Sequence, residues 1–104
     1  MSQNLAEKTE GLASRVKNLA VHHAGESGRQ LLEEQDKLAK LALAAIVKEL
    51  NEEHEDYEAA LQGLDNAIEY IGNADKQIEG VSEAIKLTAK AVALVEKALK
   101  NAPI

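Results

Sequence analysis

Residues 43–71 read LAAIVKELNEEHEDYEAALQGLDNAIEYI, and a large residue returns in this stretch at every seventh position. The spacing continues beyond it, so the full series is Leu43, Leu50, Tyr57, Leu64, Ile71, Ile78, Ile85, Val92 and Leu99. A companion series, shifted by three positions, is Ile46, Glu53, Ala60, Ala67, Ala74, Val81, Thr88 and Val95. Alternating steps of three and four place both series on one helical face and are typical of coiled-coil-like packing. We therefore expect the large residues Leu64, Ile71, Ile85 and Val92 to be buried.

The remainder of the chain also has a helical pattern. Near the start, Leu5, Leu12, Val16 and Leu19 share one face at helical spacing. Strong helix formers dominate throughout, β-branched residues occur singly, and the one proline is Pro103. The sequence thus predicts an all-α fold, formed by residues 1–104 as a single domain.

Two glycine-containing segments are predicted to be turns. Residues 25–28, Gly-Glu-Ser-Gly, interrupt the first apolar pattern. We expect Gly25 to follow the end of one helix and Ser27 to cap the next. In the second turn, Gly72 would end a helix and Asn73 would cap its successor.

The acidic segment at residues 51–56 decides between two architectures. Its like charges repel within a continuous helix, whereas they favour the first turn of a new helix capped by Asn51. A turn here gives helices at about 3–24, 28–50, 52–71 and 74–101, an antiparallel up-down four-helix bundle. Without the turn, residues 28–71 form one helix of roughly 65 Å, giving a three-helix chain that packs as a dimer. The bundle is favoured because it buries the apolar faces within one chain.

Composition argues against several partners and compartments. The 104 residues carry a net charge of −6, which disfavours nucleic acid and anionic membranes as partners. There is no cysteine, so disulfides are excluded. Without tryptophan or phenylalanine the core must be aliphatic and rich in alanine, which does not suit sites that work by aromatic stacking. The longest apolar run, residues 41–47, is too short to span a bilayer, and the N-terminal residues lack a signal-peptide core. We expect a cytoplasmic protein.

No catalytic motif is present in the sequence. The serines lack a Gly-x-Ser-x-Gly context, and residues 25–28 lack the lysine and the spacing of a phosphate-binding loop. The sequence therefore predicts a protein that is not an enzyme and has no cofactor. The alternative is a metal- or ligand-binding bundle centred on residues 49–58, because carboxylates and histidine bind hard cations, zinc or iron. Its candidate ligands are Glu49, Glu53, His54, Asp56 and Glu58.

The favoured function is a non-enzymatic helical interaction or structural module. Its candidate interaction residues are Leu41, Leu43, Ile46 and Val47, which spread over too wide an arc of one helix to all point inward. We expect another protein or a second copy to cover them, most simply as a homodimer burying at least about 1,000 Å². By analogy of class only, small acidic bundles include chaperones, adaptors, and antitoxin or immunity proteins.

Overall fold

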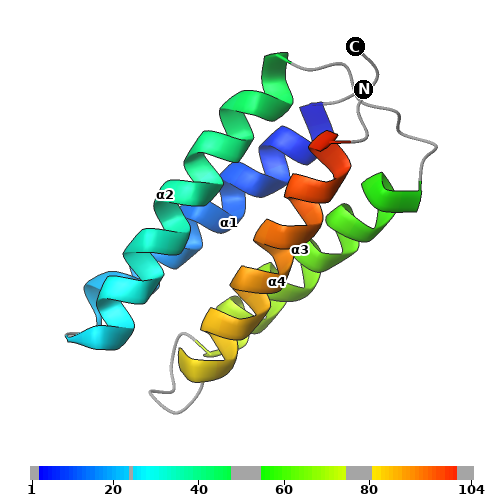
Figure 1. The fold of residues 1–104 in the computed structure, drawn as a ribbon. Helices are drawn as coiled ribbons and strands as arrows, with labels where there is room; N and C mark the ends of the chain where they lie inside the picture. Colours follow the sequence, from blue (N-terminus) through cyan, green and yellow to red (C-terminus); the bar gives the residue numbers. More distant parts are fainter. Residues whose placement is uncertain (1–2, 24, 48–54, 75–80, 101–104) are drawn as a thin grey trace.

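The computed structural model describes residues 3–23, 25–47, 55–74 and 81–100, and within these ranges the regular structure is entirely helical. The helices are α1 (Gln3–Val21), α2 (Glu26–Val47), α3 (Glu55–Ala74) and α4 (Val81–Lys100), and they lie side by side as an elongated bundle of 41 × 20 × 17 Å (Figure 1). The all-α four-helix bundle is confirmed. The alternative, one helix over residues 28–71, is wrong because α2 and α3 are separate helices running in opposite directions.

The four helices form two antiparallel hairpins, α1–α2 and α3–α4 (Figure 1). Between the hairpins, α1 packs against α3 and α2 packs against α4. These two contacts are parallel (Figure 1). The starts of α1 and α3 lie together, where Tyr57 forms a hydrogen bond with the backbone of Leu5, and further along Lys8 Nζ lies 2.6 Å from Asp65 Oδ1. As a result, α2 and α3 follow each other along the chain but occupy opposite corners of the bundle.

The predicted heptad series is buried in α3 and α4. On α3 the buried positions are Tyr57, Ala60, Leu64, Ala67 and Ile71, and on α4 they are Thr88, Val92, Val95 and Leu99. Of the four large residues expected in the core, Leu64, Ile71 and Val92 are buried, but Ile85 is only partly buried. The completely buried residues of α4 are Ala84, Thr88, Ala91 and Val95, so Ile85 lies beside this line, at the edge of the buried face. The predicted apolar face of α1 is buried as well.

The buried face does not follow the series into α2. Leu43 and Ile46 are 67% and 59% exposed, and α2 instead buries Leu31, Leu38 and Ala45. A heptad pattern predicts a common face only along one continuous helix. Since α2 and α3 are separate, each rotates to bury its own face. Leu50, Glu53 and Ile78 of the series lie outside the described residues.

The first turn differs from the expected one in its capping. α1 already ends at Val21, and α2 begins at Glu26, which places Ser27 inside the first turn of α2 rather than at its cap. Gly25 has a φ of +79°, and its carbonyl accepts a hydrogen bond from the Arg29 N–H at 3.1 Å. A glycine adopts this left-handed backbone at little cost, so the chain reverses at Gly25 and α2 begins earlier than predicted.

The predicted turn at Gly72 and Asn73 is also wrong, because α3 continues through both residues to Ala74. A glycine within a helix costs only about 1 kcal/mol relative to alanine, which is too little to end a helix held by tertiary packing. Asn51, the other predicted cap, lies outside the described residues.

Tyr57 provides a test of this packing through its titration. Burial raises the pKa of the Tyr57 hydroxyl above its usual value near 10, and a hydrogen bond with the backbone of Leu5 only partly opposes this effect. In a Tyr70→Phe variant, which keeps Tyr57 as the one tyrosine, the phenolate absorbance should appear at higher pH in folded than in urea-unfolded protein. Because the unfolded chain then loses its proton first, stability should fall as pH rises above about 10. Identical midpoints would contradict the burial of Tyr57.

Candidate interaction surface

Exposed apolar side chains gather on one hairpin. Among the residues that the structure describes, the large apolar side chains that are more than half exposed are Val21, Leu32, Leu43 and Ile46. Val21 belongs to α1 and the other three to α2. The described parts of α3 and α4 have none, so the α1–α2 hairpin differs from the rest of the bundle surface.

A groove of about 370 Å³ runs between α1 and α2. Its lining residues are Glu10, Ala13, Ser14, Lys17, Gln35, Ala39, Ala42, Leu43 and Ile46. The groove exists because short side chains at Ala13, Ala39 and Ala42 leave space between the two helices. Leu43 and Ile46 form an apolar wall at one end of this space.

Helical spacing continues the groove beyond its lining residues. On α1, residues 10, 14, 17 and 21 are separated by four, three and four positions, so Val21 lies on the same face as Glu10 and Ser14. On α2, Leu32 and Ile46 are each seven residues from Ala39 and share its face. We call the groove together with Val21 and Leu32 the α1–α2 surface.

The four predicted interaction residues divide between this surface and the core. Leu43 and Ile46 lie in the groove wall, whereas Leu41 is partly buried and packs against the core. The side chain of Val47 lies outside the described part of the chain. Sequence reasoning missed Val21, Leu32 and the α1 side of the groove. The seven-residue spacing of Leu32, Ala39 and Ile46 is the signal from which a second apolar line on α2 could have been found.

Charged groups are distributed along the α1–α2 surface with both signs. Glu10 and Lys17 line the groove about 10 Å apart along α1, at seven residues and 1.5 Å per residue. Outside the groove lining, Lys40 Nζ of α2 lies 3.0 Å from Asp36 Oδ2, and both side chains are largely exposed. The α1–α2 surface therefore combines an apolar line with one acidic and one basic side chain, Glu10 and Lys17.

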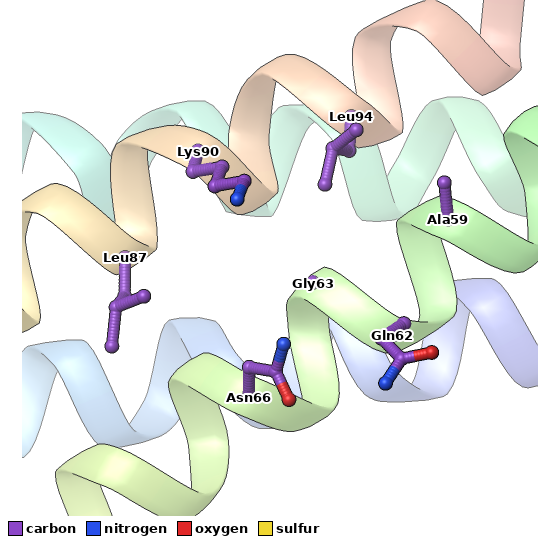
Figure 2. A pocket seen from close by; sticks show the side chains of 7 residues that line it. All are labelled: Ala59, Gln62, Gly63, Asn66, Leu87, Lys90 and Leu94. Atoms are coloured by element: carbon purple, nitrogen blue, oxygen red, sulfur yellow. The ribbon is translucent and has the colours of Figure 1, made fainter.

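A second groove, of about 350 Å³, lies between α3 and α4 (Figure 2). Its lining residues are Ala59, Gln62, Gly63, Asn66, Leu87, Lys90 and Leu94. Leu94 extends toward Gly63, and a Cβ atom built on Gly63 would lie 2.6 Å from Leu94 Cδ1. Leu87 and Leu94 are partly buried against the core, and Gln62, Asn66 and Lys90 form a polar rim. We interpret this groove as the space left by packing a leucine over a glycine.

The acidic segment is described only in part. Asp56 has 12% of its side chain exposed, and its Oδ1 lies 3.6 Å from Lys97 Nζ of α4, while Glu58 is exposed on another side of α3. Glu49, Glu53 and His54 lie outside the described residues. Within the described ranges, no group of three or more histidine, aspartate and glutamate side chains is close enough to hold a metal ion. That the five residues together bind a metal ion therefore stays a prediction.

Each helix of the bundle has a polar and an apolar side. In the ranges that the structure describes, no helix combines the length and the apolar character required to cross a membrane. Glu55, Asp56 and Glu58 lie in the first turn of α3, where carboxylates interact favourably with the helix dipole, so their clustering has a local structural cause.

Comparison of the chain with protein-family models, with curated proteins and with solved structures finds no match.

Proposed function

We propose that this chain is a non-enzymatic helical interaction or structural module that acts through the α1–α2 surface. The observation that carries the proposal is the location of the four most exposed large apolar side chains on that one hairpin. Complete burial of a leucine or isoleucine side chain contributes about 1.5–3 kcal/mol, so covering Leu43 and Ile46 favours association. The groove between α1 and α2 suits an apolar helix face from another chain.

A protein partner fits the charge of the molecule better than nucleic acid or an anionic membrane. The net charge is −6, which opposes binding to phosphate-rich surfaces. The α1–α2 surface itself carries both signs of charge, which suits pairing with another polypeptide. We also propose the cytoplasm as its compartment, and a chain without cysteine agrees with a reducing environment.

Lysine substitutions at the groove wall test the proposed surface. The double variant Leu43→Lys, Ile46→Lys should lose its complex, because two cations would be buried in an apolar contact. Both side chains are exposed in the bundle, so the unfolding free energy of the isolated chain should change by less than about 0.5 kcal/mol per substitution. Molar mass is measured by light scattering, and stability by circular dichroism during urea unfolding.

Two control variants define what the lysines do. Ala89→Lys with Ala93→Lys adds the same charge to exposed positions of α4 and should leave the complex intact. Leu41→Lys should instead destabilise the fold, because Leu41 packs against the core. The proposal is overturned if the wild-type chain has a mass of 11.2 kDa and recovers no protein from its native host that the double variant loses.

A further inference from the structure

We propose that a second copy of this chain packs against the outer face of the α3–α4 hairpin, with α3 of each copy lying along α4 of the other. This inference goes beyond the proposed function, because it concerns the hairpin that does not carry the α1–α2 surface. It rests on an acidic line on α3 and a basic line on α4, which have the same length and spacing and lie at matching levels along the bundle.

The acidic line runs along the exposed side of α3, a helix with five acidic residues and no basic one. Steps of three, four, three and four residues connect its members, so they share one face over fourteen residues, about 21 Å. Carboxylates three or four residues apart repel each other, so this face is unfavourable while it is uncovered. The members of the acidic line are Glu55, Glu58, Gln62, Asp65 and Glu69, all exposed.

The basic line runs along the exposed side of α4. Its steps of four, three, four and three residues also cover fourteen residues, about 21 Å. Lysines three or four residues apart repel each other as the carboxylates do. The members of the basic line are Lys86, Lys90, Ala93, Lys97 and Lys100, all exposed.

The two lines border the groove between α3 and α4. Gln62 of the acidic line and Lys90 of the basic line both line this groove (Figure 2). The acidic line extends from there toward α1, where Asp65 contacts Lys8. Across the outer face of the hairpin, the order is therefore acidic line, groove and basic line.

Contacts within the hairpin relate the levels of the two lines. Asp56 Oδ1 lies 3.6 Å from Lys97 Nζ, and a Cβ atom built on Gly63 would lie 3.7 Å from Ala91 Cα. Because α3 and α4 are antiparallel, counting from either contact places each acidic residue within about two residues, or about 3 Å, of the level of one lysine. A flexible lysine side chain spans that distance. The pairs at matching levels are Glu55 with Lys100, Glu58 with Lys97, Asp65 with Lys90, and Glu69 with Lys86.

A two-fold axis parallel to the helices brings the two lines together. Such an axis keeps every residue at its level and places α3 of one copy opposite α4 of the other. Each acidic line then faces the basic line of the second copy, so the four pairs form twice. The two grooves also face each other, and the partly buried Leu87 and Leu94 that line them become covered.

An axis perpendicular to the helices does not fit the charges. It would place α3 against α3 and α4 against α4, so carboxylates would face carboxylates and lysines would face lysines. Like charges that meet across an interface oppose binding, so the charges select the parallel axis. The two lines also disfavour nucleic acid on this face, because the acidic line repels phosphates.

Salt dependence is the first test of this dimer. Exposed ion pairs are individually weak and are screened by salt, so a contact that depends on many of them should be sensitive to ionic strength. At low salt and micromolar concentration the wild-type chain should have twice the mass of 11.2 kDa. Raising the salt from about 0.05 M to about 0.5 M should raise the dissociation constant at least about tenfold, measured by sedimentation equilibrium.

Two charge-reversed variants test which lines meet. Lys86→Glu with Lys90→Glu makes part of the basic line acidic, and Asp65→Lys with Glu69→Lys makes the matching part of the acidic line basic. Each variant alone should be monomeric, because like charges would meet in its homodimer. An equal mixture of the two should form a heterodimer, since opposite charges then meet on both sides.

Controls verify that the charges act through this face. Glu7→Lys with Glu33→Lys makes a similar charge change at exposed positions of the other hairpin and should leave the dimer intact. Urea unfolding of each charge-reversed variant verifies that its bundle is folded before its mass is interpreted.

The outcomes separate this inference from the proposed function. A wild-type chain that stays at 11.2 kDa at low salt, a dimer that salt does not weaken, or a mixture of variants that stays monomeric overturns the α3–α4 dimer. The complex of the proposed function depends on Leu43 and Ile46, so it should persist at high salt and be lost in the Leu43→Lys, Ile46→Lys variant. That variant should keep the α3–α4 dimer, and loss of the dimer in it would overturn the inference.

Discussion

Replacing Leu64 with alanine should lower the free energy of unfolding by about 2–5 kcal/mol. Leu64 is completely buried in the middle of α3 and belongs to the core formed by all four helices. Its truncation removes apolar contacts and leaves a cavity that a bundle of packed helices cannot fully close. Domains of this size are usually stable by about 5–15 kcal/mol, so one substitution would remove a large share of the total.

The measurement is urea unfolding followed by circular dichroism. Leu61→Ala is the matched control, since Leu61 lies on the same helix but is only partly buried, and its loss should be distinctly smaller. A loss of less than about half a kcal/mol for Leu64→Ala would mean that the heptad face of α3 is directed to water.

Gly28→Ala should destabilise the bundle, by about 1–3 kcal/mol. Gly28 is buried where α2 leaves the first turn, and a Cβ atom there would lie 2.1 Å from the carbonyl oxygen of His23. The obstructing atom belongs to the backbone, so no side-chain rotation relieves the overlap. The end of α1 and the start of α2 would have to separate, and this cost exceeds the gain of about 1 kcal/mol from the higher helix propensity of alanine.

Gly72→Ala provides the opposite expectation for the same chemical change. Gly72 is exposed within α3, and a Cβ atom there meets nothing within 4 Å. Alanine should therefore stabilise the bundle by up to about 1 kcal/mol. Thermal unfolding of the two variants under identical conditions compares them directly. Equal stabilisation by both would show that the close approach at Gly28 does not exist.

The helical faces of α1, α3 and α4 were predictable from the sequence because each has one dominant apolar line. α2 has two, the buried line through Leu31, Leu38 and Ala45 and the exposed line through Leu32, Ala39 and Ile46. Periodicity alone cannot choose between such lines. The choice depends on where the neighbouring helices lie, which is a property of the whole bundle.

The candidate surface was predictable only in part for the same reason. Leu43 and Ile46 of the apolar run at residues 41–47 are exposed in the bundle, and their role as interaction residues stays a prediction. Which α1 residues stand beside them depends on the packing of the hairpin. The caps at Ser27 and Asn73 were wrong because residue type alone does not fix where a helix begins when packing holds the adjoining turns.

The positions of α2 and α3 at opposite corners of the bundle distribute the chain-entropy cost of folding unevenly. Contacts within the α1–α2 hairpin close a loop that includes only the short reversal around Gly25. The contact between Lys8 and Asp65, by contrast, joins residues separated by 57 positions, because the parallel α1–α3 pairing spans both α2 and the segment after it. The entropic cost of closing a loop rises with the logarithm of its length, so forming the α1–α3 pairing costs more chain entropy than forming either hairpin. The core between the hairpins must therefore offset a larger ordering penalty than the turns within them, and Leu64 and Val16 lie in that core.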